Sequence, residues 1–393
     1  MHKSMYVEAG DGSHPPIANA QRASGIYSNN FDSLRLILAL LVIFSHSYMV
    51  GRGSNLIEPL YVLTGGQLTL GYISVWGFFG ISGFLITKSW LGSPSVWKFL
   101  RHRVGRIYPG FTVAALICAF LVIPIATSIQ SIRQISPLHF ILHTLRLNIW
   151  ELPYAFDRNA FPNSVNSSLW SIPFEFWCYL MTLLMGLLGV LRWRHLLSLI
   201  FLGLLCGRLL FDMTGSQPHW PFLANIIGDL YTWFVVLPFF MAGMLFHLYG
   251  GPRLIRTPWV VLSAVVLVVS VAIPHALLFT MPICGVYLLM KLAYARSLNF
   301  LDLGRRGDFS YGVYLYAWPI QQLVVMKAGG ALNPLLLFAV AAPSALLLGM
   351  LSWFLVERHF IPAKIDRSRV SEAGNPTSAS LVNNGLVEPC LVA

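Results

Sequence analysis

Charged residues are scarce in this sequence. Of its 393 residues only 10% are Asp, Glu, Lys or Arg, whereas 56% are hydrophobic, and the mean hydropathy is +0.68. Soluble domains carry about 25% charged residues, so an ordinary water-soluble fold is excluded. Intrinsic disorder is excluded as well, because disordered chains are poor in apolar residues.

Cysteine is also scarce, and no two cysteines form a CxxC pair. This excludes a disulfide framework and a cysteine-based zinc site. The histidines form no cluster with ligand spacing, so we expect no metal. The five cysteines, four of them within apolar runs, are Cys118, Cys178, Cys206, Cys284 and Cys390.

Long apolar runs are what the chain has in abundance. A stretch of about 20 apolar residues crosses a bilayer as a helix, and runs that do not alternate with period two exclude a barrel. We therefore expect an all-α integral membrane protein, a polytopic bundle of about ten transmembrane helices in a lipid bilayer. The ten runs are 34–50, 71–92, 107–128, 169–191, 195–212, 222–249, 259–274, 275–292, 307–327 and 331–356.

The basic residues are distributed as in a membrane protein. With ten spans and both termini cytoplasmic, 20 of the 26 Lys and Arg residues fall in inner segments, 5 fall in outer ones, and Arg208 lies within a span. This bias follows the positive-inside rule, so the net charge of +11 does not indicate a nucleic-acid partner. We expect a multi-pass protein of a bacterial inner membrane.

Three parts of the chain are predicted. Residues 1–30 lack an apolar signal-peptide core and are expected to be a disordered cytoplasmic N-terminus. Residues 31–358 are expected to form the transmembrane domain, and residues 359–393 a flexible cytoplasmic tail. The long outer connection at about 129–168 is expected to serve as an acceptor-binding lid.

Two ionisable residues share one face of the first apolar run. Arg35 and His46 are eleven residues apart, which is close to three helical turns and about 16 Å along the axis. Insertion of a charged side chain into the bilayer costs about 2.5–3.5 kcal/mol. An ionisable residue within a span therefore indicates a functional role. The alternatives are a neutral His46 bonded to a backbone carbonyl group and an Arg35 that anchors the interface with Asp32.

Glu175 is a second intramembrane ionisable residue, in SLWSIPFEFWCYL. Counted from the outer end of its span, it lies about 9 Å deep, and His46 about 6 Å. We therefore expect the two side chains to meet, with Glu175 orienting the imidazole ring. The alternative is a carboxylate buried against hydroxyl groups such as that of Ser171.

A basic cluster follows the second run, in KFLRHRVGRIYP. Arg101, Arg103 and Arg106 are expected in a loop at the cytoplasmic face, immediately before a helix. Such arginines bind phosphate groups in a bidentate manner. Anchoring of the membrane orientation explains the same cluster equally well.

Two further stretches suggest contacts with substrate. Ser82 lies between Gly80 and Gly83 in the second run, where small residues permit close helix packing or backbone contact with a ligand. In the ninth run, Tyr311, Tyr314 and Trp318 form one helical stripe, which suits packing or a platform for a sugar ring.

The ordered set of motifs resembles the membrane-bound acyltransferase family 3, whose members O-acylate carbohydrates. It consists of Arg35 with His46, FFGISGFLIT at 78–87, the RxxR of Arg103 and Arg106, SLWSIPFEFWCYL at 168–180 and DFSYGVYLYAWP at 308–319. Two features depart from the family pattern. Ala317 stands where many relatives have His, and we expect no hydrolase-like domain of the kind that is fused to longer relatives.

The resemblance implies an O-acetyltransferase that uses cytoplasmic acetyl-CoA and a carbohydrate or glycolipid acceptor. It implies that Arg35 and His46 are the essential pair, that Arg103 and Arg106 form the basic motif, and that Glu175 is the acid of the fourth helix. We expect Arg35, Arg103 and Arg106 to bind the anionic end of acetyl-CoA. His46 is expected to be the general base.

Several alternatives remain open at this stage. Ser82, Tyr311 and Trp318 are the candidate substrate-binding residues, with Ser82 or the backbone near Gly83 as an oxyanion donor. The acetyl group could also pass through a covalent acetyl-His46 intermediate. The rival function is a transporter or glycan flippase, in which His46, Glu175 and Arg208 relay protons. The acceptor is compatible with a surface polysaccharide, a lipid-linked glycan or a lipo-chitooligosaccharide nodulation signal.

Overall fold

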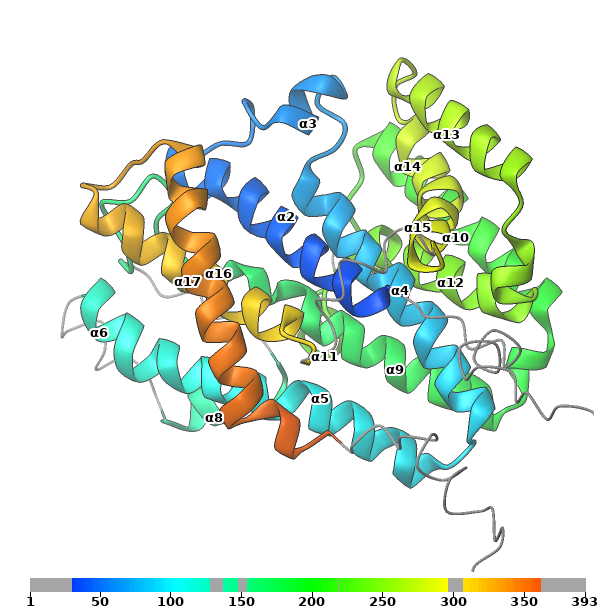
Figure 1. Ribbon diagram of the computed structural model, residues 1–393, viewed down its shortest axis with the longest axis horizontal. Coiled ribbons are helices and arrows are strands. Elements are labelled where there is room, and N and C mark those ends of the chain that lie inside the picture. The colour runs from blue at the N-terminus through cyan, green and yellow to red at the C-terminus, as the bar shows by residue number, and fades with distance from the viewer. Residues whose placement is uncertain (1–29, 128–136, 148–153, 219, 296–306, 362–393) are drawn as a thin grey trace, which may run out of the picture.

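The computed structural model describes residues 30–127, 137–147, 154–218, 220–295 and 307–361, and these form an all-helical molecule (Figure 1). The expected N-terminal segment 1–30, except Asn30, and the tail beyond residue 361 lie outside the described residues, as does part of the expected lid. The α-helices are α2 (Phe31–Arg52), α3 (Pro59–Leu63), α4 (Leu70–Gly92), α5 (Val96–Ile117), α6 (Ile123–Ala126), α8 (Pro137–Leu145), α9 (Ser171–Leu187), α10 (Arg194–Thr214), α11 (Pro221–Ile227), α12 (Leu230–Leu248), α13 (Thr257–Val271), α14 (Ala276–Thr280), α15 (Val286–Ala293), α16 (Ser310–Lys327) and α17 (Pro334–Leu355).

Short helical turns of other types join some of these helices. Within the described residues, two π-helices continue helices without a break, and four 3-10 turns lie next to helix ends. They are η1 (Cys118–Val122), η2 (Ser167–Trp170), η3 (Val190–Arg192), η4 (Gly251–Leu254), η5 (Met281–Gly285) and η7 (Glu357–His359).

All ten apolar runs contain helix, which confirms the polytopic helical fold but not the count of ten spans. Among the described residues, seven helical segments are long and apolar enough to cross a membrane: Phe31–Arg52, Leu70–Gly92, Val96–Ala126, Arg194–Thr214, Leu230–Leu248, Ala276–Ala293 and Pro334–His359. Of the others, α9 has 17 residues, α13 has 15, and α16 carries the buried polar side chains of Gln321 and Gln322.

Local sequence explains where several helices begin. The Thr69 hydroxyl accepts a hydrogen bond from the backbone N–H of Tyr72, and the Asn333 side chain accepts from Leu335 and Leu336, so both residues cap their helices. The expected run 222–249 is interrupted between α11 and α12. Gly228 has φ of +85° there, and the Asp229 side chain starts α12 by accepting from the N–H of Thr232.

Helix α4 lies at the centre of the bundle, and Figure 1 shows α2 and α4 running side by side through the middle. Glycines allow α12 to approach it closely. A Cβ atom on Gly83 would lie 1.9 Å from the carbonyl oxygen of Phe240, and one on Gly243 would lie 2.0 Å from that of Gly80. Close packing is therefore the role of the glycines around Ser82, as expected for helices that associate in a membrane.

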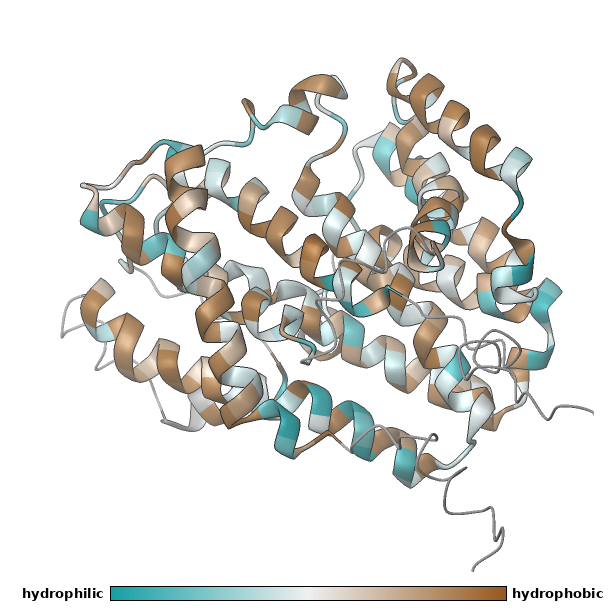
Figure 2. Ribbon diagram, in the orientation of Figure 1, coloured by the Kyte–Doolittle hydropathy of each residue, from teal (hydrophilic) through white to brown (hydrophobic). Residues whose placement is uncertain are grey.

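Figure 2 shows that α5 changes character along its length, from hydrophilic in its first half to apolar in its second. The helix begins at Val96, because the Ser95 hydroxyl accepts a hydrogen bond from the N–H of Lys98 and caps it. The prediction of a loop around Arg101, Arg103 and Arg106 is therefore wrong. A helix fixes the directions of the three side chains relative to one another.

Candidate functional site

Two cavities open beside α2, one near each end. The first, which we call the arginine cavity, is lined by Arg35, Arg103 and Arg106 together with Ser82, Ile107, Glu175, Tyr179, Ser310, Tyr311 and Tyr314. The second, the histidine cavity, is lined by His46 and Trp318 together with Ser45, Met49, Asn55, Tyr72, Phe161, Trp170 and Tyr231. Val75, in the second turn of α4, lines both cavities. The two cavities therefore meet at one side chain.

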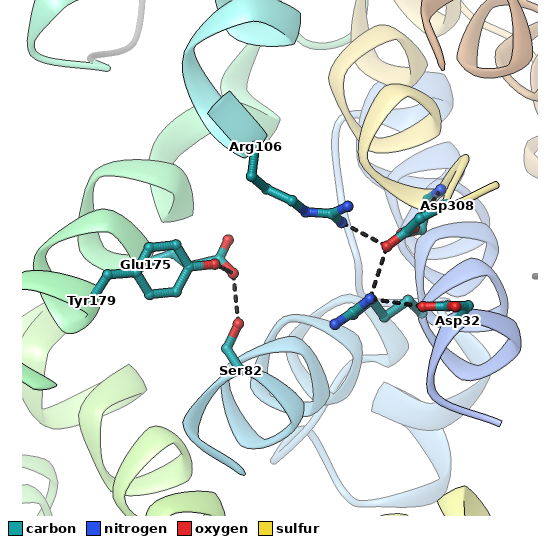
Figure 3. A network of polar contacts seen from close by, with 8 residues as sticks. Asp32, Ser82, Arg106, Glu175, Tyr179 and Asp308 are labelled. Atoms are coloured by element: carbon teal, nitrogen blue, oxygen red, sulfur yellow. Dashed lines mark hydrogen bonds and ion pairs between the residues drawn. The ribbon is translucent and has the colours of Figure 1, made fainter. Parts of the chain in front are cut away.

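A single carboxylate joins two of the three arginines in the arginine cavity. One oxygen of Asp308 lies 2.8 Å from Nη1 of Arg35 and 2.7 Å from Nη2 of Arg106. Arg35 also pairs with Asp32 at 3.0 Å. Figure 3 shows Asp308 turned toward Arg106 on one side of the cavity. The expected pair of Arg35 and Asp32 thus exists, but Arg35 lines the cavity as well.

Asp308 is ionised in this setting. Burial would raise the pKa of its carboxyl group, but the neighbouring guanidinium groups of Arg106 and Arg35 and a hydrogen bond from Ser310 hold the pKa well below its usual range. Its charge offsets part of the positive charge of the two arginines. Arg35 and Arg106 are therefore held in place before any anionic ligand arrives.

Arg103 is the arginine whose charge is not paired. Within the described part of the chain, no carboxylate lies within 4.0 Å of its guanidinium group. Nη2 donates to the Ser89 hydroxyl at 3.1 Å, and the buried Nε has no partner. The guanidinium lies over the rings of Phe99 and Tyr179, 5.4 Å and 5.7 Å from their centroids. Arg103 therefore retains both charge and donor capacity for a ligand.

Glu175 lies in the arginine cavity and not beside His46. Its Oε1 accepts hydrogen bonds from Ser82, at 2.7 Å, and from the Tyr179 hydroxyl group. Figure 3 shows Glu175 turned toward Ser82, across the cavity from Asp308. The prediction that Glu175 orients the imidazole of His46 is therefore wrong. The alternative of a carboxylate held by hydroxyl groups is correct in kind, with Ser82 and Tyr179 in place of Ser171.

The depth estimate failed because α9 does not start at a membrane surface. The helix begins at Ser171, whose hydroxyl bonds to that of Tyr314 at 2.8 Å inside the bundle. Ser168, in the preceding turn η2, is 1% exposed. The first turn of α9 is thus buried. Glu175, four residues after Ser171, therefore lies in the same cavity as Arg103 and Arg106.

His46 lines the histidine cavity without a hydrogen bond to any described residue. Its ring meets that of Trp318 edge to face, with centroids 4.9 Å apart, and its buried Nδ1 has no hydrogen-bond partner. No described residue forms a hydrogen bond with the ring, so the alternative of a histidine satisfied by a backbone carbonyl group is wrong. A neutral imidazole with unengaged nitrogens can accept a proton from a ligand.

The other predicted contact residues are divided between the two cavities. Tyr311 lines the arginine cavity and donates its hydroxyl to the carbonyl oxygen of Ile107 at 2.8 Å, whereas Trp318 lines the histidine cavity. They therefore do not form one platform. Ser82 gives its hydroxyl proton to Glu175, which leaves it unsuited as an oxyanion donor. Gly83 packs against Phe240 and lines neither cavity.

Sequence reasoning missed three residues of the arginine cavity region: Asp308, Tyr179 and Glu357. Asp308 opens the quoted motif DFSYGVYLYAWP, and Glu357 is 1% exposed where the last helix ends. The chain has only 15 Asp and Glu residues, so a carboxylate beside an apolar run was a usable signal. Nothing in the sequence distinguishes Tyr179 from the other tyrosines.

The three residues of the alternative proton relay lie in three different cavities. His46 lines the histidine cavity, Glu175 the arginine cavity, and Arg208 a third cavity beside Asp212 and His275. Within the described residues, no group of three or more His, Cys, Asp and Glu side chains could hold a metal ion.

Comparison with known proteins gives consistent matches over most of the chain. The family model described as "Acyltransferase domain" matches residues 28–354. The chain is 28% identical over 347 residues to an "O-acetyl transferase" of Shigella phage Sf6, covering 85% of this chain and 96% of the relative. It is 28% identical over 360 residues to "Nodulation protein 10" of Rhizobium leguminosarum bv. viciae, covering 86% and 94%. No solved structure matches it significantly.

Proposed function

Since the chain belongs to the acyltransferase domain family, we propose that it is an O-acetyltransferase of a bacterial inner membrane, which moves the acetyl group of acetyl-CoA to a hydroxyl group of a carbohydrate. The observation that carries this proposal is the pair of cavities that meet at Val75. One holds cationic side chains, and the other holds an unengaged imidazole. The name of the phage relative supports transfer of an acetyl group to an oxygen atom.

The arginine cavity suits the anionic end of acetyl-CoA. Arg103 offers an unpaired guanidinium group, and Arg106 and Arg35 are held beside it by Asp308. Guanidinium groups bind phosphate groups through two parallel hydrogen bonds. The basic residues predicted on the inner side support a position of this cavity at the cytoplasmic face, where acetyl-CoA is available.

The histidine cavity suits the reacting hydroxyl group. About 16 Å of helix separates Arg35 from His46, a distance that the uncharged arm of the coenzyme can bridge past Val75. The acceptor oxygen attacks the thioester carbonyl carbon while His46 takes the hydroxyl proton. The C–S bond then breaks, and the imidazolium returns the proton to the thiolate of the coenzyme. No carboxylate is needed to orient the ring, because Trp318 packs against it.

A labelled substrate tests the proposal. Membranes containing the protein are supplied with acetyl-CoA labelled in the acetyl group, and label in the glycan fraction is measured. His46→Gln should lower transfer by about 10²–10⁴-fold, the usual contribution of a general base. His195→Gln, at an exposed histidine outside both cavities, should leave it unchanged. Transfer at the wild-type rate in His46→Gln would refute the role of the base.

The same assay distinguishes direct transfer from a covalent intermediate, and it shows from which side of the membrane acetyl-CoA binds. If the acetyl group passes through a covalent intermediate, labelled acetyl-His46 accumulates when acceptor is withheld; direct transfer leaves the histidine unlabelled. Inverted vesicles, which expose the inner face, should use added acetyl-CoA, whereas right-side-out vesicles should not. The opposite result would reverse the proposed orientation.

A further inference from the structure

A third cavity lies at the same end of the bundle as His46 and takes no part in the reaction described above. We call it the loop cavity. Thr64, Gly65, Gly66 and Gln67 precede α4 on one side of it, Arg208 and Asp212 lie on α10, and the turn between α13 and α14 supplies the last wall with Val271, Ala272, Pro274, His275 and Leu278. Figure 1 places α3, α13 and α14 along one edge of the molecule.

The loop cavity contains a charged residue with unused capacity. Nη2 of Arg208 lies 3.9 Å from Oδ1 of Asp212, a long ion pair, and the other carboxylate oxygen is bonded to Nδ1 of His275. The guanidinium group lies 4.6 Å from the ring centroid of Tyr231. Its buried Nη1 has no hydrogen-bond partner. A guanidinium group within an apolar helix is costly, so an unused donor there calls for a reason.

An unused acceptor lies in the wall of the same cavity. The side-chain Nε2 of Gln67 donates to the carbonyl oxygen of Val271 at 3.0 Å, which fixes the amide group, but its buried Oε1 accepts from no group. Two residues that line the cavity thus carry a donor on Arg208 and an acceptor on Gln67, and both atoms are buried and without partners. Buried polar groups in proteins are normally paired, by the protein itself, by water or by a ligand.

This combination favours one ligand chemistry. A hydroxyl group donates one hydrogen bond and accepts others, so adjacent hydroxyls of a sugar can serve Gln67 and Arg208 together. Asp212 and His275 provide further partners. A phosphate or carboxylate group offers only acceptors, which would leave Gln67 unsatisfied and face the charge of Asp212.

The loop cavity is joined to the histidine cavity by a shared wall. The ring of Tyr231 lines the histidine cavity and carries the guanidinium group of Arg208 on its face. We propose that the loop cavity is a subsite for a second sugar unit of the acceptor, whose reacting hydroxyl lies at His46. This inference rests on the proposed acetyl transfer to a carbohydrate.

The test uses acceptor length as its variable. The glycan fraction that wild-type membranes acetylate is partially hydrolysed and separated by size, and each fraction is supplied with labelled acetyl-CoA. Longer fragments should have an acceptor KM about tenfold or more below that of the shortest fragment, as expected for one added charge-assisted hydrogen bond. In Gln67→Met and Arg208→Gln this advantage should disappear. The KM for acetyl-CoA and the rate with the shortest fragment should stay unchanged.

The other possible results distinguish failure of the proposed function from failure of the subsite. If the wild-type protein labels no glycan at all, the proposed function fails and the subsite with it. If glycan is labelled but length does not matter, or if both variants keep the preference for long fragments, the subsite is refuted while the acetyltransferase stands. An equal loss with every fragment, accompanied by a lower unfolding temperature, would show that Gln67 and Arg208 are structural only.

Discussion

The carboxylate group of Asp308 determines which guanidinium groups of the arginine cavity are paired. By binding Arg35 and Arg106 through one oxygen, it holds two guanidinium groups that would otherwise repel each other at short distance. Arg103 is left to supply the unpaired charge. Three arginines that look alike in the sequence therefore differ in their contacts: Asp308 pairs with two of them, and no carboxylate within the described residues pairs with Arg103.

Removal of the Asp308 charge should destabilise the protein in a pH-dependent manner. Asp308→Asn leaves the Arg106 guanidinium group without its carboxylate partner and Arg35 with Asp32 alone, so we expect a loss of about 3–5 kcal/mol at neutral pH. The folded-state pKa of Asp308 is depressed, so its stabilisation is present above the unfolded pKa of about 4 and is lost as the pH falls toward the folded value. Thermal unfolding in detergent measures the difference, which should shrink in acid. Asp32→Asn, at a more exposed carboxylate, should cost less. A difference that grows in acid would contradict the assignment.

Substitution of Glu175 should alter the arginine cavity and leave His46 unaffected. Because it accepts from Ser82 and Tyr179 and is not bonded to His46, Glu175→Gln should lower the transfer rate by less than about tenfold, the effect of one weakened hydrogen bond. The pH profile of the rate should keep its midpoint. A shifted midpoint, or a loss as large as that of His46→Gln, would restore the predicted contact between the two residues.

Residue types with unusual cost in a bilayer could be found from the sequence alone. Arg35, His46, Arg103, Arg106 and Glu175 all line one of the two cavities. Their pairing could not be found, because it depends on where each helix starts in depth. Helical arithmetic places residues along an axis, but it does not show that α9 begins inside the bundle.

Among the elements, the crossing of α4 and α12 sets the position of the cavities. Gly80, Gly83 and Gly243 let the two backbones touch, and α4 then presents Val75 and Ser82 to the arginine cavity. A side chain at this crossing has no free space. The neighbouring atoms belong to the backbone and cannot rotate away.

Paired glycine substitutions test this crossing. Gly83→Ala should destabilise the protein by about 1–3 kcal/mol or more, because its Cβ atom would lie 1.9 Å from a carbonyl oxygen. Gly203→Ala, in α10 with no atom within 4 Å of the new Cβ, should be neutral or stabilising by about 0.5–1 kcal/mol. Thermal unfolding of both variants gives the comparison. Equal effects would show that the glycines have no packing role.

Helix α5 separates its arginines by direction. Arg103 and Arg106 line the cavity, whereas Arg101 is exposed outside it. Arg103→Lys keeps the charge but loses the paired donors, so the KM for acetyl-CoA should rise about tenfold to a hundredfold with kcat little changed. Arg101→Ala should leave both constants unaltered. If Arg101→Ala raises the KM equally, the cluster acts through overall charge and not through the cavity.

The helices were easier to predict than their ends. All ten apolar runs contain helix because their residues can satisfy backbone hydrogen bonds internally in a membrane in no other way. The start of α5 at Val96 was missed because its first half is amphipathic, with arginines that interrupt the apolar pattern. The break between α11 and α12 was missed because Gly228 and Asp229 lie in an otherwise apolar stretch.

At the scale of the whole molecule, two chemically different cavities share one lining side chain, that of Val75. The arginine cavity holds charged side chains, and the histidine cavity holds an imidazole and aromatic rings. Under the proposed function, the first binds the nucleotide end of acetyl-CoA and the second binds the sugar. The thioester must then pass Val75 to reach the acceptor hydroxyl group.

Because Val75 lines both cavities, a larger side chain at this position tests the proposed transfer between them most directly. Val75 is 5% exposed, and Val75→Phe would fill the junction, whereas Val75→Ala would leave it open. We predict that Val75→Phe retains labelled acetyl-CoA on membranes as the wild type does but transfers the acetyl group at least about 10²-fold more slowly, because the reacting atoms cannot reach bonding distance. Val75→Ala should bind and transfer. Transfer at the wild-type rate in Val75→Phe, with the protein folded, would show that donor and acceptor do not meet through these two cavities.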